Sequence, residues 1–503
     1  MTGTYGRWIA ALLLGVPAIT PAQNVAIASY PVTPPNTGGP NAITRGPDGA
    51  LWLTLGSGSI GRMTAAGAFT AYPITTPNSD PQGIAVGPDG ALWFTESAGN
   101  QIGRITTAGV VTEFPVLTAN SSPWGIAAGP DGALWFTENA GDQIGRITTS
   151  GTVTEYRNVY GAEPAGITAG PDGALWFTEY IQVGRITTSG SIGSWEVTST
   201  SSSPQGITAG PDGALWFTEA GANLIGRITT AGATTEYSAF GTDPFSITAR
   251  GSDGALWFTN SYSNGIGRIT TAGAVTEYPA PPSNFENTGS TGIATGPDNA
   301  LWFTEFGAGM IGEAVFVGAN MFVSPPGGHP GLGATGTSIS FSGNGFAPNE
   351  TVRIYTSGIG STVLATAVAD SSGSFSSQER YATLPDSPFG YRLFLGNGVT
   401  SGKIAAATFQ VTPKLLVSPS FGPPGGTSSA KGYGYAAFDT VDVYWESPYT
   451  FLGSAVADST GTFVGSAALT FTIPSGLGFG DYQLQGTGTN VPQASDTATL
   501  QVQ

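Results

Sequence analysis

The sequence PQGIAVGPDGALWFTE, from Pro81 to Glu96, decides the fold because close copies of it recur along the chain. Clear copies lie at 123–138, 164–179 and 204–219, and looser copies surround three further tryptophans. The recurring tryptophans are Trp52, Trp93, Trp135, Trp176, Trp216, Trp257 and Trp302, in steps of 41, 42, 41, 40, 41 and 45 residues. A nearly fixed period of this length indicates a repeat architecture.

Each repeat is typical of four short antiparallel strands. In the clearest copy, Gly83–Val86 and Ala91–Thr95 flank the turn sequence Gly87-Pro88-Asp89-Gly90, which favours a hairpin. Ile102–Thr106 and Val111–Pro115 supply the third and fourth strands. Four strands repeated radially are the blade of a β-propeller, so we predict an all-β, seven-bladed propeller over residues 24–318.

The last repeat indicates how the ring closes. It has candidates for three strands but no fourth, whereas Ala28–Val32 near the start of the chain loosely matches a fourth strand. We therefore predict that the N-terminal strand completes the seventh blade and removes the exposed sheet edges. The third strands carry Arg104, Arg146, Arg227 and Arg268, which we expect to pair across the turn with Glu113, Glu155, Glu236 and Glu277.

A second kind of repeat follows the propeller. Val323-Ser324-Pro325 returns as Val417-Ser418-Pro419, and VADSSGSF from 368 to 375 returns as VADSTGTF from 456 to 463. Two tandem modules are therefore predicted, at 319–412 and 413–503, and their alternating strands are typical of an immunoglobulin-like β-sandwich. Asp370 and Asp458 lie in hairpin-type turns, which we prefer to a calcium site.

Composition limits the partners and the compartment. The net charge of −17 argues against nucleic acid and anionic membranes. It keeps a glycine-rich protein soluble, and it also allows a cationic ligand. Residues 1–22 resemble a secretory signal peptide, and we expect a secreted or cell-envelope protein without a membrane span. The absence of cysteine rules out disulfides and thiolate metal sites.

Hairpin symmetry predicts a candidate ligand site at one mouth of the ring. The second residue of each copy, here called the slot residue, follows Pro81 and its equivalents (Ser290 in the last copy) and should neighbour the residue that ends the WFTE strand. The slot residues are Asn41, Gln82, Trp124, Ala165, Gln205, Phe245 and Thr291. The strand-end residues are Leu55, Glu96, Glu138, Glu179, Glu219, Asn260 and Glu305. Five carboxylates on one rim would suit a cation or a polar ligand, unless each one only satisfies backbone donors nearby.

Other repeated residues are interpreted as structural. The turn aspartates lie on the opposite face and should cap turns; they are Asp48, Asp89, Asp131, Asp172, Asp212, Asp253 and Asp298. The repeated tryptophans should pack between blades. Trp124 differs because it occupies a slot, where it could stack on a sugar or another flat ligand.

The repeated GPDGALWFTE and IGRITTAG sequences resemble the virginiamycin B lyase (streptogramin lyase) family over residues 24–318. The resemblance implies a seven-bladed propeller that linearises a cyclic depsipeptide by elimination with a magnesium ion. It implies a histidine in the slots of the last two blades, a glutamate two residues before the last of these, and a nearby WFTE glutamate for the metal. Here these slots hold Phe245 and Thr291, the preceding position holds Gly289, and only Glu305 matches.

This departure favours binding over catalysis. The only histidine, His329, lies in the linker after the ring, so no slot supplies an imidazole base. Glu163 and Glu179 keep the 16-residue spacing of the family's metal-associated carboxylates and are candidate metal ligands, as are Asp80 and Glu96.

Three classes of function remain open at this point. The leading prediction is a non-catalytic binding or scaffold protein without a cofactor, whose partner is a small molecule, a glycan, a peptide or a surface protein. The alternatives are a magnesium-dependent lyase of the streptogramin type and a purely structural envelope spacer.

Overall fold

The computed structural model describes residues 24–502 apart from 33–38, 65–68, 159–161, 240–242, 251–252, 263–264, 280–288, 298, 308, 325–331, 335–339, 357–362, 378–389, 413, 434, 436–439, 447–448, 458–461, 465–466, 474–479 and 489–494. The predicted signal peptide, Asp298, His329 and Asp458 lie outside the described residues. No helix in the described part of the chain is long and apolar enough to cross a membrane.

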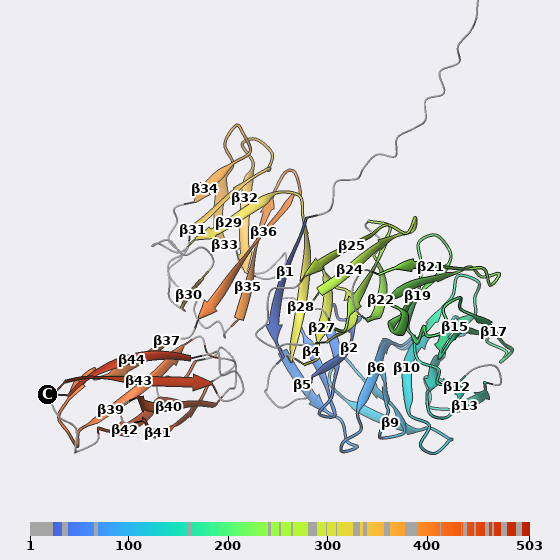
Figure 1. The fold of residues 1–503 in the computed structure, drawn as a ribbon, viewed down its shortest axis with the longest axis horizontal. Helices are drawn as coiled ribbons and strands as arrows, with labels where there is room; N and C mark the ends of the chain where they lie inside the picture. Colours follow the sequence, from blue (N-terminus) through green and yellow to red (C-terminus); the bar gives the residue numbers. More distant parts are fainter. Residues whose placement is uncertain are drawn as a thin grey trace, which may run out of the picture.

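Seven four-stranded antiparallel sheets form the propeller, as predicted (Figure 1). Blades one to three comprise β2(Pro40–Arg45), β3(Leu51–Leu55), β4(Ser59–Met63), β5(Phe69–Pro73); β6(Pro81–Val86), β7(Leu92–Glu96), β8(Gln101–Ile105), β9(Val111–Pro115); and β10(Pro123–Ala128), β11(Leu134–Glu138), β12(Gln143–Ile147), β13(Val153–Arg157). Blades four and five comprise β14(Ile167–Ala169), β15(Leu175–Glu179), β16(Gln182–Ile186), β17(Ile192–Glu196); and β18(Pro204–Ala209), β19(Leu215–Glu219), β20(Leu224–Ile228), β21(Thr234–Ser238), with the 3-10 helix η1(Ala220–Ala222). Blade six comprises β22(Pro244–Arg250), β23(Ala255–Asn260), β24(Gly265–Thr270) and β25(Val275–Pro279).

The N-terminal strand closes the ring, which confirms the prediction from the missing fourth strand. The seventh sheet has the order β1-β28-β27-β26, where β1 is Asn24–Pro31, β28 is Met310–Val317, β27 is Leu301–Glu305 and β26 is Ser290–Thr295. Strand β1 pairs antiparallel with β28 over its full length. No blade of the closed ring is left with three strands, and the two ends of the propeller chain are held in one sheet.

The repeated tryptophans pack between blades, as expected. Trp93 is fully buried and packs against Leu134 and Phe136 of the next blade. The same arrangement recurs around the ring, where Trp135 packs against Leu175 and Phe177. Because a buried aromatic side chain contributes a large apolar area, each tryptophan stabilises a blade-to-blade contact rather than a single sheet.

The turn aspartates hold both the tryptophans and the arginines. Asp89 accepts hydrogen bonds from Trp93 Nε1 at 3.0 Å and from Arg104 Nε at 2.7 Å. The expected pairing of Arg104 with Glu113 is wrong, because the turn closes on Thr106 and Val110 and so places Arg104 opposite Thr112. Glu113 instead accepts hydrogen bonds from the backbone and hydroxyl groups of Thr75 and Thr76.

The same correction applies to the other repeats. Arg146, Arg227 and Arg268 bind Asp131, Asp212 and Asp253, respectively. Glu155 and Glu236 accept from loops of the preceding blades, and Glu277 faces Gly267. In the seventh blade, Glu313 occupies the arginine position and accepts a hydrogen bond from Tyr30 Oη at 2.7 Å.

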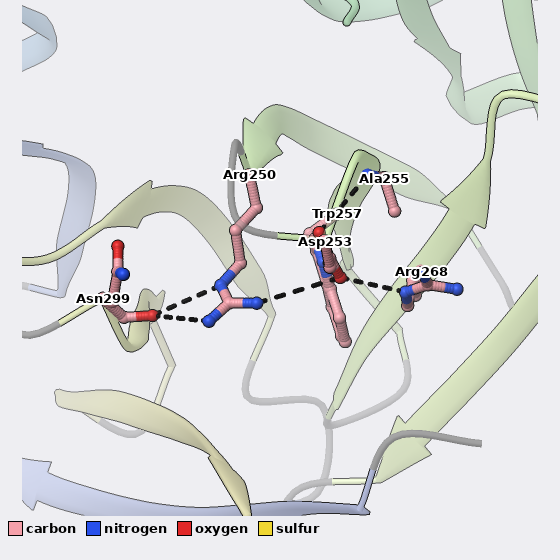
Figure 2. A network of polar contacts seen from close by, with 6 residues as sticks. All are labelled: Arg250, Asp253, Ala255, Trp257, Arg268 and Asn299. Carbon is pink, nitrogen blue, oxygen red and sulfur yellow. Dashed lines mark hydrogen bonds and ion pairs between the residues drawn. The ribbon is translucent and has the colours of Figure 1, made fainter. Parts of the chain in front are cut away.

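Blade six carries an additional arginine at the end of its first strand (Figure 2). Arg250 donates to the backbone oxygen of Asn299 at 3.0 and 3.2 Å, and its guanidinium lies 3.4 Å from the centre of the Phe316 ring. Leu395 and Ile404 of the following module line the same small cavity. Arg250 therefore links blades six and seven at the place where the first β-sandwich packs against the propeller.

The C-terminal region forms two β-sandwiches with the same sheet topology. The first has sheets β29-β31-β34 and β30-β36-β35-β32-β33, and the second has β37-β39-β42 and β38-β44-β43-β40-β41. The strands are β29(Asn320–Ser324), β30(Leu332–Ala334), β31(Ser340–Asn344), β32(Thr351–Thr356), β33(Val363–Val368), β34(Phe375–Ser377), β35(Gly390–Gly398), β36(Ile404–Thr412), β37(Lys414–Ser418), β38(Phe421–Gly422), β39(Thr427–Tyr433), β40(Thr440–Glu446), β41(Tyr449–Val456), β42(Leu469–Thr472), β43(Gly480–Gly488) and β44(Ser495–Val502).

Each sandwich has its own apolar core, centred on residues such as Phe394 and Trp445. The first sandwich lies beside β1 and β28 of the propeller (Figure 1). Asp370 accepts hydrogen bonds from the backbone of Ser372 and Ser374, which is the hairpin-turn role expected from the sequence.

Candidate functional site

The slot residues are held at the mouth of the ring by a threonine in every blade. Thr95, in the WFTE strand β7, accepts a hydrogen bond from Gly83 N at 2.9 Å and donates to the carbonyl oxygen of Trp124 at 2.6 Å. Equivalent contacts to the slot carbonyl of the next blade are made by Thr54, Thr137, Thr178, Thr218, Thr259 and Thr304. These contacts fix the slot backbone, while the slot side chain is free to differ from blade to blade.

In five blades a glycine follows the slot and allows neighbouring inner strands to approach one another, whereas Ala42 and Ser246 take this position in blades one and six. A Cβ atom built on Gly125 would lie 2.5 Å from the carbonyl oxygen of Ala165, and one on Gly166 would lie 2.3 Å from that of Gln205. Such distances are too short for any side chain, so glycine is required for close backbone approach. The inner strands are consequently drawn into a tight ring around the axis.

The structure brings six slot side chains together around a central cavity of about 300 Å³. The cavity is lined by Asn41, Gln82, Trp124, Gln205, Phe245 and Thr291, together with Phe306 and the glycines that follow five of the slots. None of the described lining residues is charged. An apolar wall with a few amide and hydroxyl groups is typical of a small-molecule binding site.

The glutamates expected on the same rim lie elsewhere. A β-bulge after Pro81 places Pro81, rather than Gln82, opposite Glu96, and the same shift occurs at Pro123 and Glu138. The side chains of Glu96, Glu138, Glu179, Glu219 and Glu305 are at most 1% exposed and do not line the central cavity. The predicted pairing of slot and glutamate is therefore wrong, because the residue before the slot lies opposite the glutamate. The carboxyl groups are enclosed and do not face the cavity.

Burial changes the ionisation of these carboxyl groups. Desolvation raises the pKa of Glu96 and of Glu219 to about 8, and that of Glu138 and of Glu305 to about 7. Both carboxyl oxygens of Glu96, Glu138 and Glu219 lack a hydrogen-bond partner within normal geometry. Ser29 Oγ donates to Glu305 at 2.8 Å, which partly offsets the effect of burial on its pKa.

In blade four, both carboxyl oxygens of the buried glutamate accept hydrogen bonds. Asn158 and Ser194 both donate to Glu179, although desolvation still raises the pKa of Glu179. Its predicted metal partner, Glu163, is exposed and lines a different hollow, from which Glu179 is absent. Asp80 has a positive backbone φ of 51°, and its backbone oxygen accepts a hydrogen bond from Ser97 N.

The residues present do not fit a magnesium site of the kind that the resemblance implies. Magnesium prefers several oxygen ligands in an octahedral arrangement. Among the described residues, no group of three or more His, Asp or Glu side chains is arranged to hold a metal ion. Glu305 is enclosed, and the position that would add a second carboxylate is Gly289.

Comparison with known proteins places the propeller in a family. The virginiamycin B lyase family matches residues 25–238 and 158–321, which together span more than half of the chain. The chain belongs to the virginiamycin B lyase family. A macroglobulin-like domain matches residues 325–411, which identifies the first β-sandwich more closely than the immunoglobulin-like prediction did. No curated protein matches the chain.

Solved lyase structures are similar over the propeller. A streptogramin B lyase is 37% identical, with a TM-score of 0.55, and covers 58% of this chain and 98% of its own. The Staphylococcus aureus virginiamycin B lyase is 38% identical, with a TM-score of 0.55, over 58% of this chain and all of its own. A catalytically inactive histidine-to-alanine variant of that lyase, with quinupristin, is 37% identical with the same TM-score and coverage.

Sequence reasoning found the slots but missed the threonines that fix them. Thr95 and its equivalents are identical in all seven repeats, and this identity was the available signal. A threonine at the end of a strand is also typical of ordinary β-sheet, so its contact with the next blade could be recognised only in three dimensions. Phe306, which lines the cavity, was likewise not singled out, because it follows the repeat rather than belonging to it.

Proposed function

We propose that the propeller is a non-catalytic ligand-binding domain of an exported protein, and that the β-sandwiches serve as a scaffold near the cell surface. The observation that carries this proposal is the central cavity, whose uncharged slot side chains stand on a backbone fixed by Thr95 and its equivalents. A rigid backbone with varied side chains provides preorganised binding at low entropic cost.

The absence of an imidazole from the slots supports binding without turnover. Elimination needs a base that is partly free near neutral pH, and histidine is the side chain best suited to that role. The slots of blades six and seven hold Phe245 and Thr291, and the only histidine in the sequence is His329. The S. aureus lyase variant that lost one histidine is inactive and still carries quinupristin, so a propeller of this family holds a ligand without converting it.

Binding to isolated bacterial cell-wall sacculi tests the proposal. The purified full chain is incubated with sacculi, and the fraction that sediments is measured for the wild type and for Trp124→Ala. We expect the wild type to sediment and the variant to remain in solution, because Trp124 lines the central cavity. Equal sedimentation of both proteins, or of neither, would count against a cell-wall ligand at this mouth.

The competing function is a lyase of the streptogramin type, which the family membership and Glu305 favour. The full chain is incubated with quinupristin and magnesium, and linearised product is measured by mass spectrometry. We expect intact quinupristin. Product that disappears in Glu305→Gln would establish the lyase activity and overturn the proposal.

A further inference from the structure

We propose that a hollow between blades three, four and five is a binding subsite for a neutral saccharide. This inference rests on the proposed function and deepens it, because the hollow shares Trp124 and Gln205 with the central cavity. Its volume is about 200 Å³. The other lining residues are Asn139, Glu163, Ala165, Tyr180, Ser203 and Pro204.

The blade at the centre of the hollow, blade four, has the smallest slot residue. Ala165 stands between Trp124 and Gln205 around the ring, and its backbone is fixed by Thr137 like that of the other slots. The methyl group of Ala165 takes up less volume than the glutamine side chains in the slots of blades two and five. The first strand of this blade is also shorter than those of the other blades, because β14 begins only at Ile167, after the slot.

Aromatic side chains provide flat surfaces at the hollow. Trp124 is half-buried, and the side chain of Tyr180 is 60% exposed although it directly follows the buried Glu179. A pyranose ring presents an apolar C–H face that packs on such rings, and both tyrosine and tryptophan combine an apolar surface with a polar group.

The remaining groups match hydroxyls better than they match charges. Asn139, Ser203 and Gln205 offer amide and hydroxyl groups, and Glu163 adds one exposed carboxylate that can accept hydrogen bonds. The described lining includes no lysine, arginine or histidine, so an anionic sugar would find no counter-charge.

The backbone at Glu163 belongs to a turn that recurs in other blades, where Asp80 and Asp243 have positive φ values of 51° and 60°. Glu163 has a φ of 54°, a conformation that L-residues adopt infrequently, and its amide donates to Asp142 Oδ1 at 2.9 Å. This hydrogen bond holds the turn that carries Glu163 toward the hollow. Ser203, on the opposite side, also has a positive φ of 42°.

The test uses a panel of neutral gluco-, galacto-, manno- and N-acetylglucosamine oligosaccharides, with choline as a cationic control. Binding to the full chain is measured by calorimetry for the wild type, Ala165→Gln, Tyr180→Ala and Tyr262→Ala. Ala165→Gln fills the hollow with a residue that neighbouring slots already carry, and Tyr262 is an exposed tyrosine away from the hollow. Thermal melting shows that each variant is folded.

We expect one or more neutral saccharides to bind, with affinity weakened by at least about tenfold in Ala165→Gln and Tyr180→Ala and unchanged in Tyr262→Ala. Binding of choline alone, of no saccharide, or of a saccharide equally well by Ala165→Gln would overturn the inference.

Variants of the central cavity separate this inference from the proposed function. If Gln82→Ala and Phe245→Ala abolish saccharide binding while Ala165→Gln does not, the central cavity is the binding site and the hollow is not. If only Ala165→Gln and Tyr180→Ala abolish binding, the hollow is the site and the central cavity is not.

Discussion

The two faces of the propeller are built from the same repeat but differ in how much they vary. On the turn face, Asp89 binds both Trp93 and Arg104, and the same three-residue contact is present in blades one to six. On the mouth face, the slots carry seven side chains of six different types. The uniform face holds blades together, whereas the varied face combines a fixed backbone with differing side chains, as a binding surface requires.

Two tryptophans of blade three give the largest expected contrast between the faces. Trp135 is fully buried between blades, and Trp124 is half-buried at the mouth. Trp135→Ala should lower the free energy of unfolding by about 3–5 kcal/mol, because it removes a large buried side chain. Trp124→Ala should lower it by less than about 1 kcal/mol. Denaturant unfolding measures both, and similar losses would contradict the division into two faces.

The aspartate of the same blade should give the next largest effect. Asp131 accepts from Trp135 Nε1 at 3.0 Å and from Arg146 Nε at 2.7 Å. Burial opposes ionisation, yet these hydrogen bonds outweigh it and lower the pKa of Asp131. Asp131→Ala should cost about 1–3 kcal/mol of stability, because a buried indole N–H loses its acceptor. Asp131→Asn keeps an acceptor and should lose less stability than Asp131→Ala; equal losses would show that the charge alone matters.

The buried glutamates behind the slots should make stability depend on pH. Desolvation raises the pKa of Glu219 from 4.5 to about 8, so the folded state holds a proton that the unfolded state releases. The free energy of unfolding should therefore fall as the pH rises from the ordinary glutamate pKa of 4.5 to the raised pKa of about 8. Glu219→Gln should stabilise the protein by about 1–2 kcal/mol near pH 9 and change little near pH 5.

Glu113 provides a control of opposite sign for that experiment. Burial tends to raise its pKa, but hydrogen bonds from Thr75 and Thr76 outweigh burial and lower the pKa of Glu113. Its contribution to stability is present at neutral pH and is lost as the pH falls through the lowered pKa. Glu113→Gln should therefore destabilise the protein at neutral pH. If Glu219→Gln and Glu113→Gln shift the free energy of unfolding in the same direction, burial of Glu219 does not cause the pH dependence.

The smallest expected effect is at the arginine of the turn face. The Arg146 side chain is 23% exposed where it pairs with Asp131, and it lies 5.8 Å from the centre of the Trp135 ring. Arg146→Ala should cost about 0–1 kcal/mol, and less at high salt, because partly solvated ion pairs are weak. A salt-independent loss above that range would show that packing on Trp135 dominates.

The sequence predicted the features that depend on repetition. The spacing of the tryptophans and the missing fourth strand were sufficient for the blade number and for closure by β1. Register was less predictable, because a one-residue difference in a turn decides whether Arg104 faces Glu113 or Thr112. The bulge after Pro81 likewise places Glu96 opposite Pro81 instead of Gln82.

The hollow beside Ala165 could not be predicted from one repeat. Its walls come from three blades, and its volume depends on side chains that are far apart in the sequence. The burial of Glu96 also depends on packing around the loop that contains Ser79, which the repeat pattern does not specify. The sequence therefore predicts which residues occupy the mouth of the ring, but it does not predict which of their side chains are exposed.

Sedimentation with cell-wall sacculi tests the division of roles between the faces most directly when mouth-face and turn-face variants are compared side by side. Trp124→Ala and Arg146→Ala each remove one partly exposed side chain from blade three, on opposite faces. We expect that Trp124→Ala abolishes sedimentation and that Arg146→Ala sediments like the wild type. Loss of sedimentation in Arg146→Ala with retention in Trp124→Ala would contradict this expectation.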